Sequence, residues 1–312
     1  MAIEFGVHLP QLGRNADRET LLEFAREVDQ LGIDSAWTSD HIAWPRDIQS
    51  RYPYTESGDF PAPFDTPWLD PLATLAFVAA VTERIRLGTT VQIMGYRPPV
   101  QSAKFWATLD QLSGGRAILG VGVGWMKEEF EALGMPFDHR GARADEQLEA
   151  YDVLFRQDAP SYAGRFYSFP EVSFLPKPVR GHIPIWVGGH TAPAFRRAAK
   201  YGDGLHAAFT PMEELREHWA AVQAECDAIN RDPAELELST RVYLDPGGRM
   251  DAAKSLQGGD AELVASIERW AEVGVSHLIL EPVAGGGAQG RMDLIRRFVG
   301  DVRPLIAEGS GS

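Results

Sequence analysis

The sequence predicts an α/β fold, a (β/α)8 TIM barrel with insertion segments at the carboxyl ends of its strands. Eight short apolar segments of strand character alternate with eight segments of helical period. The chain has 312 residues, within the range of a single barrel of this kind. Several predicted strands end on glycines or titratable side chains, where this fold assembles its active site. An open doubly wound sheet is the alternative, and it would not require eight consecutive units.

The first half of the chain begins with two strand predictions that flank a helix. Ile3–Leu9 is rich in β-formers, apolar residues recur at helical spacing over Leu21–Leu31, and a second strand covers Ile33–Thr38. After a long interruption, Asp70 is a suitable N-cap for a helix with Pro71 at its first position. The elements expected next are a strand at Ile85–Ile93, a helix at Pro99–Leu112, a strand at Ala117–Val121, and helices at Lys127–Ala132 and Arg140–Arg156.

The second half continues the alternation after an irregular stretch. A small hairpin is expected at Ser161–Phe169, turning at Ala163–Gly164. The remaining expected elements are strand Ile183–Val187, helix Pro193–Tyr201, strand Gly204–Ala208, helix Glu213–Asn230, strand Leu236–Leu244, loop Asp245–Asp260, helix Ala261–Val273, strand Ser276–Leu280 and helix Arg291–Val302. No linker or repeat indicates a second domain.

Two irregular insertions interrupt the barrel pattern. The first, residues 44–68, is rich in Pro, Asp, Tyr and Phe, and it is far longer than the usual loop of about 2–6 residues. It is expected to act as a lid. The second insertion covers about residues 157–182. Residues 1–308 are expected to form one domain, and residues 309–312 a flexible tail or cloning remnant.

Composition narrows the class of protein. The formal net charge of −14 opposes general nucleic-acid binding, which depends on neutralising phosphates with Lys and Arg. No apolar run approaches the roughly 18–20 residues needed to span a bilayer, so no membrane contact is expected. Cys226 cannot form an internal disulfide, and the N-terminus shows no secretory signal. Both observations indicate the cytoplasm.

Polar residues at the strand ends are the candidates for chemistry. Asp40 and His41 directly follow the second strand and precede the lid insertion. An imidazole can give or take a proton near neutral pH, so His41 is the expected proton donor or acceptor. The other strand ends carry His8, residues 89–92, residues 122–125, residues 188–191, His206 and Glu281. His8 and His206 lack the context of His41, and structural roles are favoured for both.

Two glycine-rich strand ends would let a planar or phosphorylated ligand approach the backbone. Gly122-x-Gly124 is a weak indicator, because Met126 and Lys127 stand where the dinucleotide fingerprint needs its third glycine. Residues 188–191, Gly-Gly-His-Thr, precede a helix and are a better phosphate cradle, with Arg or Lys side chains nearby. Ordinary tight turns are the alternative at both places.

Aromatic residues near the strand ends indicate an apolar pocket. The candidates for its wall are Trp44, Trp68, Tyr96 and Trp125. Of these, Trp44 and Tyr96 are expected to contact substrate. Trp37 lies inside a predicted strand and is assigned to the core.

Five segments resemble the luciferase-like monooxygenase superfamily, in the branch that uses the deazaflavin coenzyme F420. In chain order they are GVHLP at 6–10, WTSDHI at 37–42, TERIRLGTT at 82–90, GGRAILGVGVGW at 114–125 and PIWVGG at 184–189. The likeness extends over nearly the whole chain. It implies a (β/α)8 barrel with the cofactor ring lying across the strand ends.

The resemblance also implies roles for individual residues. It places His41 near the reactive ring carbon and Asp40 within hydrogen-bonding distance of the cofactor. It implies a bulge at Thr90–Val91, where family members often have a non-proline cis peptide behind the ring. Gly188 and Gly189 match contacts to the phosphate-bearing tail. The full set expected to bind cofactor is Asp40, Thr90, Val91, Gln92, Val123, Gly124, Trp125, Val187, Gly188, Gly189 and His190, and no metal is expected.

The resulting expectation is an F420-dependent oxidoreductase that moves a hydride between the cofactor and a small organic substrate. The family's sugar-phosphate dehydrogenase has an acidic residue where Trp125 stands and a hydroxyl residue where Ala208 stands. Sugar phosphates are therefore disfavoured, and a hydrophobic or aromatic substrate is expected. Because family members are often dimers, a homodimer is also expected.

Three alternatives stay open at this stage. An FMN-dependent monooxygenase of the same superfamily would activate dioxygen with flavin reduced elsewhere. A metal-dependent barrel hydrolase would need its ligands to converge within about 2.0–2.2 Å of one ion. Its candidate ligands are His8, His41, His206 and Glu281. A non-catalytic flavin-binding barrel is the last alternative, and turnover of bound cofactor would separate it from an enzyme.

Overall fold

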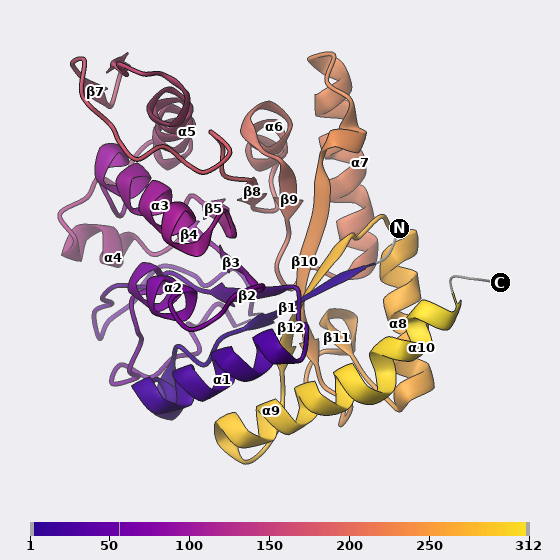
Figure 1. The fold of residues 1–312 in the computed structure, drawn as a ribbon. Coiled ribbons are helices and arrows are strands. Elements are labelled where there is room, and N and C mark those ends of the chain that lie inside the picture. Colours follow the sequence, from indigo (N-terminus) through magenta and orange to yellow (C-terminus); the bar gives the residue numbers. More distant parts are fainter. Residues whose placement is uncertain (1–2, 56, 310–312) are drawn as a thin grey trace.

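The computed structural model describes residues 3–55 and 57–309, and it confirms the predicted barrel (Figure 1). The barrel wall consists of parallel strands in the spatial order β1 (Glu4–His8), β2 (Ser35–Thr38), β3 (Arg86–Thr89), β5 (Ala117–Gly122), β8 (Ile185–Gly188), β9 (Gly204–His206), β10 (Glu237–Leu244) and β12 (His277–Pro282). Strand β9 pairs with β10 and β12 pairs with β1, so the sheet closes on itself.

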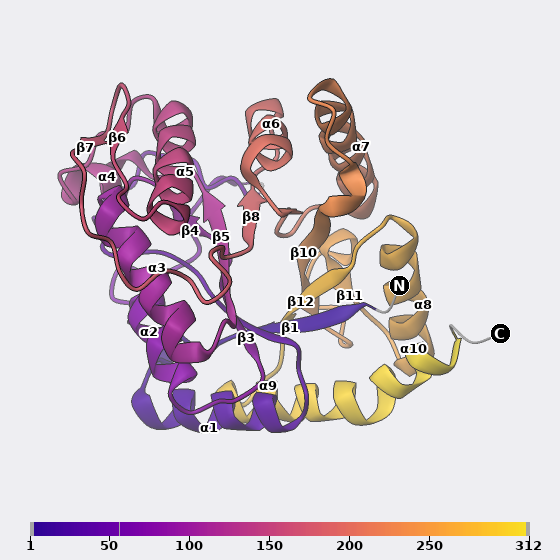
Figure 2. The same ribbon diagram turned by 45° about the horizontal axis from the view of Figure 1, so that its top comes forward.

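Helices cover the outside of the barrel, as Figures 1 and 2 show from two directions. They are α1 (Arg18–Gln30), α2 (Pro71–Ala79), α3 (Pro99–Ser113), α4 (Lys127–Ala132), α5 (Arg140–Arg156), α6 (Ala192–Tyr201), α7 (Met212–Ala228), α8 (Asp260–Glu272), α9 (Gly287–Arg297) and α10 (Arg303–Gly309). A search of the described residues found no helix with the length and apolar character that a bilayer crossing requires.

The single strand expected at residues 85–93 is in fact two strands, β3 and β4 (Gln92–Ile93). They are separated at Thr90 and Val91, whose peptide bond is cis, as the resemblance implies. The interruption is a bulge, because the Thr90 N–H donates to the Thr38 carbonyl at 2.7 Å while β4 pairs with β5 further along. The strand pattern of residues 85–93 did not indicate this break, whereas the resemblance implied a bulge there.

The loop expected at residues 245–260 contains regular structure. A 3-10 turn covers Ala252–Lys254, and β11 (Ser255–Leu256) pairs with β10. The turn forms because the Asp251 carboxylate accepts a hydrogen bond from the Ala253 N–H at 3.0 Å. The loop prediction was therefore wrong for this segment.

Two further boundaries differ from expectation. The final helix is longer than residues 291–302, since α9 continues through a π-helical turn at Phe298–Val302 into α10. The predicted hairpin exists as β6 (Tyr162–Ala163) and β7 (Ser168–Phe169), but its turn spans residues 164–167. Of the tail expected at 309–312, Gly309 ends α10 and the rest lies outside the described residues.

The barrel interior has its own small core. It consists of four side chains with at most 1% exposure, namely Trp37, Ile118, Trp186 and Ile279. The rings of Trp37 and Trp186 stack with centroids 5.1 Å apart. A Cβ on Gly88 would lie 2.4 Å from the Trp37 ring, and one on Gly6 would lie 2.5 Å from its nitrogen. Trp37 is thus confirmed as a core residue, and it fits because two neighbouring strands carry glycine there.

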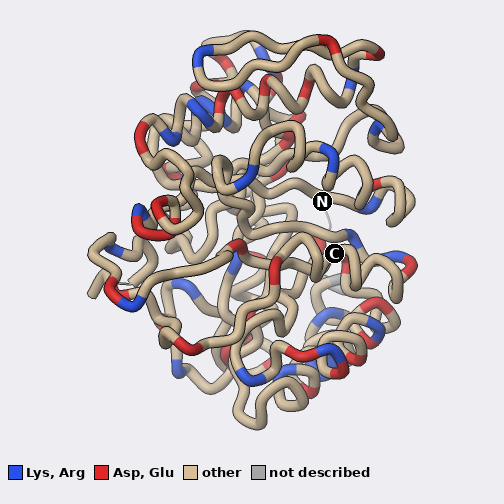
Figure 3. Tube along the Cα trace, turned by 90° about the vertical axis from the view of Figure 1, so that its left-hand side faces the viewer, with Lys and Arg blue, Asp and Glu red and all other residues tan. Residues whose placement is uncertain are grey.

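Charged residues of both signs alternate along the helices on the face shown in Figure 3. Some pair within one helix, as Arg156 does with Asp152 at 2.5 Å and Lys127 with Glu131 at 3.4 Å. Exposed pairs of this kind contribute little to stability because water screens them. Positive and negative residues are therefore interspersed on this face and do not form a patch of one sign.

Candidate active site

His41 follows the carboxyl end of β2, on the barrel rim, and a buried carboxylate holds its ring. Nδ1 of His41 lies 2.6 Å from Oε2 of Glu129, in the first turn of α4. The Glu129 side chain has no exposed surface. Because the carboxylate accepts the Nδ1 hydrogen, Nε2 is the ring nitrogen left for proton exchange with a ligand.

Three other groups also bind the Glu129 carboxylate. The Tyr96 hydroxyl donates to Oε2 at 2.8 Å, and the N–H groups of Ile42 and Ala43 donate to Oε1 at 2.6 and 3.1 Å. Burial alone would raise the pKa of Glu129, but the bonds from His41 and these donors hold that pKa below its ordinary value. Glu129 is therefore ionised near neutral pH and fixes the orientation of the His41 ring.

The insertion at residues 44–68 packs its aromatic residues against His41. Four rings surround the imidazole, with centroids at 4.8, 5.0, 6.0 and 6.1 Å: Phe60, Trp68, Trp44 and Trp125, respectively. The indole nitrogen of Trp44 is buried and has no acceptor among the described residues. The His41 ring therefore lies among aromatic side chains with one unsatisfied donor nearby. The lid role of this segment stays a prediction.

The insertion is attached at two places. Oε1 of Glu128, in α4, accepts the N–H groups of Gln49 and Ser50 at 2.9 and 3.1 Å. Further along, the Tyr54 ring meets His190 edge-on with centroids 5.5 Å apart, and His190 follows β8. The insertion thus extends over the strand ends from α4, which follows β5, to the loop after β8, the strand next to β5.

Asp40, predicted to contact cofactor, is fully buried beneath Arg97. The guanidinium donates to both carboxylate oxygens, at 2.7 and 3.0 Å, and the Ile93 N–H donates to Oδ2 at 2.9 Å. Burial raises the pKa of Asp40, and Arg97 opposes that shift. Arg97 also binds Asp70, the N-cap of α2, at 3.0 Å. In this conformation Asp40 ties β2, β4 and α2 together, and its contact with cofactor stays a prediction.

Val91 covers two glycines at the strand ends. A Cβ on Gly122 would lie 2.5 Å from Cγ2 of Val91, and one on Gly188 would lie 2.9 Å from Cγ1. The Val91 side chain therefore fills the space in which a Cβ atom at either glycine would lie. Thr90, beside it, shares a 2.7 Å hydrogen bond with Nε2 of His206. These residues together form a packed surface at the ends of β5 and β8.

The turn from β5 to α4 contains Val123, Gly124 and Trp125. Gly124 has a φ of 77°, and a Cβ there would lie 2.7 Å from Cγ2 of Ile93, so the turn requires glycine. The turn directs the Trp125 ring toward the insertion, where it meets Tyr52 with centroids 5.1 Å apart. Trp125 therefore links the strand ends to the segment above them.

The chain leaves β8 through Gly189, whose φ of 140° favours glycine. Thr191 caps α6 without a side-chain hydrogen bond, but Pro193 has no N–H and the N–H groups of Ala194 and Phe195 donate to the Thr191 carbonyl at 2.8 and 3.1 Å. In the first turn of this ten-residue helix, the Ala192 N–H is therefore the donor left for an anion. The cations of the helix are already paired with carboxylates: Arg196 with Glu225, Arg197 with Asp145 and Lys200 with Glu149. Phosphate binding here would rely mainly on backbone donors.

Gln92, Tyr96 and Val187 lie behind the rim in this conformation. The amide of Gln92 donates to Ser102 at 3.0 Å and accepts from Trp106 at 2.6 Å, both on α3. Val187 belongs to the main core, and Tyr96 is 5% exposed with its hydroxyl bound to the Glu129 carboxylate. Their predicted contacts with cofactor or substrate stay predictions.

The candidate ligands of a metal hydrolase do not form a common ligand group among the described residues: His8, His41, His206 and Glu281. Both ring nitrogens of His206 are bonded, to Thr90 at 2.7 Å and Ser239 at 2.6 Å, and burial lowers the pKa of His206 to about 3. Burial alone would raise the pKa of Glu281, but two arginines, Arg241 and Arg291, lower it to about 2. The structure therefore does not form the proposed hydrolase site.

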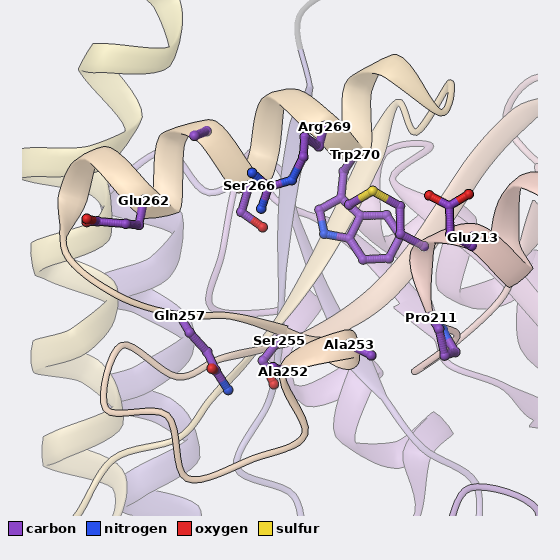
Figure 4. Close-up of a pocket in the computed structure, with 12 residues that line it drawn as sticks. Pro211, Glu213, Ala252, Ala253, Ser255, Gln257, Glu262, Ser266, Arg269 and Trp270 are labelled. Carbon is purple, nitrogen blue, oxygen red and sulfur yellow. The ribbon is translucent and has the colours of Figure 1, made fainter.

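A cavity of about 490 Å³ lies between α7, α8 and the 252–257 segment (Figure 4). Its lining includes Arg269 and Trp270 of α8 and Gln257 of the preceding loop. None of the predicted site residues lines it. We therefore consider the His41 region, rather than this cavity, as the candidate active site.

Glu129 is the functional residue that sequence reasoning missed. Its separation of 88 residues from His41 carries no signal at the level of local pattern. The available hint was that the short helix at Lys127–Ala132 begins directly after the glycine-rich end of a barrel strand. A carboxylate in the first turn of such a helix lies at the catalytic face.

Known proteins resemble this chain over most of its length. The model of the luciferase-like monooxygenase family matches residues 3–300. An uncharacterized protein of Mycobacterium tuberculosis is 35% identical over 236 residues, which cover 76% of this chain and 80% of that protein. An F420-dependent glucose-6-phosphate dehydrogenase of Kineococcus radiotolerans is 26% identical over an alignment that covers 92% of each chain.

Two solved structures have the same fold. An F420-dependent secondary alcohol dehydrogenase in complex with an F420-acetone adduct superposes with a TM-score of 0.79 at 18% identity, covering 98% of this chain and 99% of the other. The oxygenating constituent of 3,6-diketocamphane monooxygenase from Pseudomonas putida, in complex with FMN, gives 0.74 at 16% identity, with 98% and 99% coverage. At these identities the likeness establishes the barrel and no shared substrate.

Proposed function

Because the chain belongs to the luciferase-like monooxygenase family, we propose that it is an F420-dependent oxidoreductase acting on a small hydrophobic or aromatic organic substrate. The relative with F420 in its name supports this choice of cofactor, since it aligns over 92% of both chains. The observation that carries the proposal is the hydrogen bond between His41 and the buried Glu129 carboxylate, within a ring of aromatic side chains.

The His41–Glu129 pair supplies the proton chemistry of the proposed reaction. When bound, the deazaflavin accepts or supplies the hydride. In the oxidative direction the substrate is an alcohol, and the hydride leaves from the carbon that bears the hydroxyl group. Nε2 of His41 takes the proton of that hydroxyl group. The Glu129 carboxylate stabilises the imidazolium that forms, because it already accepts the Nδ1 hydrogen. In the reductive direction the same imidazolium returns the proton to the developing alkoxide.

Two features of the chain suit the cofactor. Val91 and the glycines beneath it, Gly122 and Gly188, form a surface on which a flat ring can lie. Beyond them, the backbone at Gly189 and the Ala192 N–H at the start of α6 are the donors proposed for a phosphate group. Both features lie at the carboxyl ends of barrel strands, where ligands of this fold bind.

The surroundings of His41 support an apolar substrate. Phe60, Trp68 and Trp125 contribute only ring surface near the imidazole. The buried indole N–H of Trp44, which has no acceptor among the described residues, is a donor suited to a substrate oxygen. A small alcohol or ketone with an apolar body meets both requirements. The homodimer expected from the sequence stays a prediction.

A binding titration tests the choice of cofactor. The purified protein is titrated with F420 and, separately, with FMN, while tryptophan fluorescence is followed. We expect F420 to bind at least about 10-fold more tightly, a difference of about 1.4 kcal/mol. Gly189→Ala should weaken F420 binding because of its φ of 140° and the 2.7 Å approach of a Cβ to Ala194. Gly181→Ala is the control, since Gly181 also has positive φ but lies in open space.

The FMN-dependent monooxygenase is the second candidate, and the FMN complex among the similar structures favours it. Tighter binding of FMN than of F420 would select this alternative and contradict our proposal. Binding of neither cofactor would contradict both. Reduced F420 that binds but is not consumed with any ketone, and oxidised F420 that is not reduced with any alcohol, would indicate a non-catalytic binding protein.

A further inference from the structure

A second cluster of chemically active side chains lies on the rim near β8, outside the His41 site. One potential ligand atom from each of His190, Glu214 and His218 lies within 4.8 Å of the other two. Glu214 and His218 are four residues apart on α7, so they share one helix face, and Nε2 of His218 lies 3.5 Å from Oε1 of Glu214. His190 reaches them from the loop after β8, with its ring 5.8 Å from that of His218.

Two imidazoles and one carboxylate are a ligand set that divalent zinc takes with a fourth position left open. We propose that His190, Glu214 and His218 form a binding site for a divalent transition-metal ion of the Zn²⁺ class. Water or an anionic group would fill the fourth position. The absence of metal expected from the sequence is thereby revised, because the three residues come together only in the folded chain.

The surroundings of His190 suit a metal ligand. Nδ1 of His190 shares a 3.1 Å hydrogen bond with the hydroxyl of Thr210, which is 2% exposed. A ligating histidine usually has its second nitrogen bonded in this way, which fixes the ring and leaves Nε2 for the metal.

The surroundings of His218 also favour a ligand. Its Nδ1 is buried and has no hydrogen-bond partner among the described residues. Buried polar atoms of this kind are normally satisfied. Nε2 is the nitrogen that lies 3.5 Å from Glu214, so no hydrogen bond among the described residues commits the ring to another partner. Phe195 packs on the ring with centroids 4.9 Å apart and limits its rotation. The ring is thus held in place beside Glu214.

A comparison within the chain separates this cluster from an ordinary ion pair. Glu4, Glu237 and His277 form a similar group at the other end of the barrel, but Arg86 already binds Glu4 there. In the His190 cluster, no Lys or Arg of the described residues pairs with Glu214, although the charge of Lys254 acts on His190. Lys254 also lies 4.0 Å from the carboxylate of Asp251.

The first test uses the tag-free protein and Co²⁺ alone, with no F420 or FMN present. Co²⁺ in a site of low coordination number absorbs visible light, so ligation has a spectroscopic signature. We expect one equivalent of Co²⁺ to bind with such a spectrum, and Zn²⁺ to displace it in a calorimetric competition. Because cofactor is absent, failure of this test would not contradict the proposed oxidoreductase function. Failure of the F420 titration would likewise not contradict the proposed metal site.

Variants identify the ligands. Glu214→Gln alters a half-exposed side chain and should weaken metal binding by at least about 10-fold without unfolding the protein. His218→Ala should abolish the Co²⁺ spectrum. His182→Ala is the matched control, since His182 pairs with the single carboxylate of Asp203 at 2.7 Å and should leave binding unchanged. Circular dichroism and the melting temperature establish that each variant folds.

Two results would overturn the proposal. One is the absence of stoichiometric Co²⁺ or Zn²⁺ binding to the folded wild-type protein. The other is binding that survives both Glu214→Gln and His218→Ala, which would place the metal elsewhere.

Discussion

Glu129 and His41 meet in surroundings of low polarity, where a hydrogen bond to a charged group is strong. The carboxylate also receives two backbone N–H groups of the segment that follows His41, so it orders that segment as well as the ring. At this scale, function depends on one buried charge whose bonds are all internal. A substitution that removes the charge of Glu129 but keeps its shape separates its effect on the His41 ring from its effect on the segment that follows.

Glu129→Gln is expected to lower kcat by at least about 100-fold, because a neutral amide no longer stabilises the imidazolium of His41. The amide oxygen can still accept the N–H groups of Ile42 and Ala43, so the fold and the dissociation constant of the cofactor should change little. Steady-state kinetics and a cofactor titration measure the two quantities. His41→Ala combined with Glu129→Gln should cost no more than His41→Ala alone, since the residues act as a unit.

Glu131→Gln is the control for this prediction, because Glu131 lies on the same helix and is 61% exposed. A folded Glu129→Gln variant with wild-type kcat would show that the carboxylate does not support proton transfer.

At the scale of elements, the insertion at residues 44–68 is held by short contacts to α4 and by aromatic packing. Phe60 and Trp68 pack against the His41 ring with centroids 4.8 and 5.0 Å away, so we expect a substrate to reach the ring when this segment moves aside. Glu128, next to Glu129 in the sequence, holds the segment through Gln49 and Ser50. Two neighbouring glutamates of α4 thus have different partners: Glu129 binds the His41 ring, and Glu128 binds the insertion.

Glu128→Ala is expected to release the insertion, because two backbone N–H groups lose their charged acceptor. Trypsin cleavage within the segment, at Arg46 or Arg51, should become about 10-fold faster, and KM for substrate should rise. Proteolysis followed by mass spectrometry measures the first effect. Glu131→Ala is the control on the same helix, and equal cleavage rates in the wild type and Glu128→Ala would contradict the anchoring role.

The pH dependence of this anchor has a definite sign. Burial raises the pKa of Glu128, but its hydrogen bonds from Ser50 and Gln49 lower it below the ordinary value. The anchor's contribution to stability is therefore complete above that ordinary value, about 4.3, and is lost as the pH falls through the lower pKa of the folded state.

At the scale of the whole molecule, buried histidines link the stability of the barrel to pH. His8, His206 and His277 are each at most 1% exposed. Burial lowers the pKa of all three, that of His206 to about 3. The unfolded chain binds protons at these residues near pH 6.5, whereas the folded chain does not. Their contribution to stability is thus complete above about pH 6.5 and is lost as the pH falls.

The melting temperature is therefore expected to fall steadily from pH 7 to pH 5. Each fully unprotonated histidine contributes a slope of up to about 1.4 kcal/mol per pH unit. This window lies above the range in which most carboxylates titrate, so the slope reports on the histidines. His206→Asn should reduce the slope, whereas His182→Gln, at a partly exposed ion pair, should not. A flat melting temperature between pH 7 and pH 5 would contradict this explanation.

Much of the fold could be predicted from local pattern. Strand and helix periods, together with the Asp70–Pro71 helix start, identified the barrel. The polar residues after β2 identified the candidate proton donor, and the resemblance supplied the cis peptide at Thr90–Val91, which the structure contains. These features depend on residues close together in the chain, which is why a single sequence carries them.

The partners of those residues were decided by the tertiary structure. Glu129 on His41, Arg97 on Asp40 and the group of His190, Glu214 and His218 each join elements far apart in the chain. The break between β3 and β4 also depends on tertiary contacts, because β4 pairs with β5 rather than continuing along β2. Local propensity describes one segment at a time, whereas these contacts depend on the register at which the barrel closes and on the packing of the helices around it. The sequence by itself therefore determined that the candidate site lies at the carboxyl end of β2. The folded chain decided which charged side chains contact the residues there.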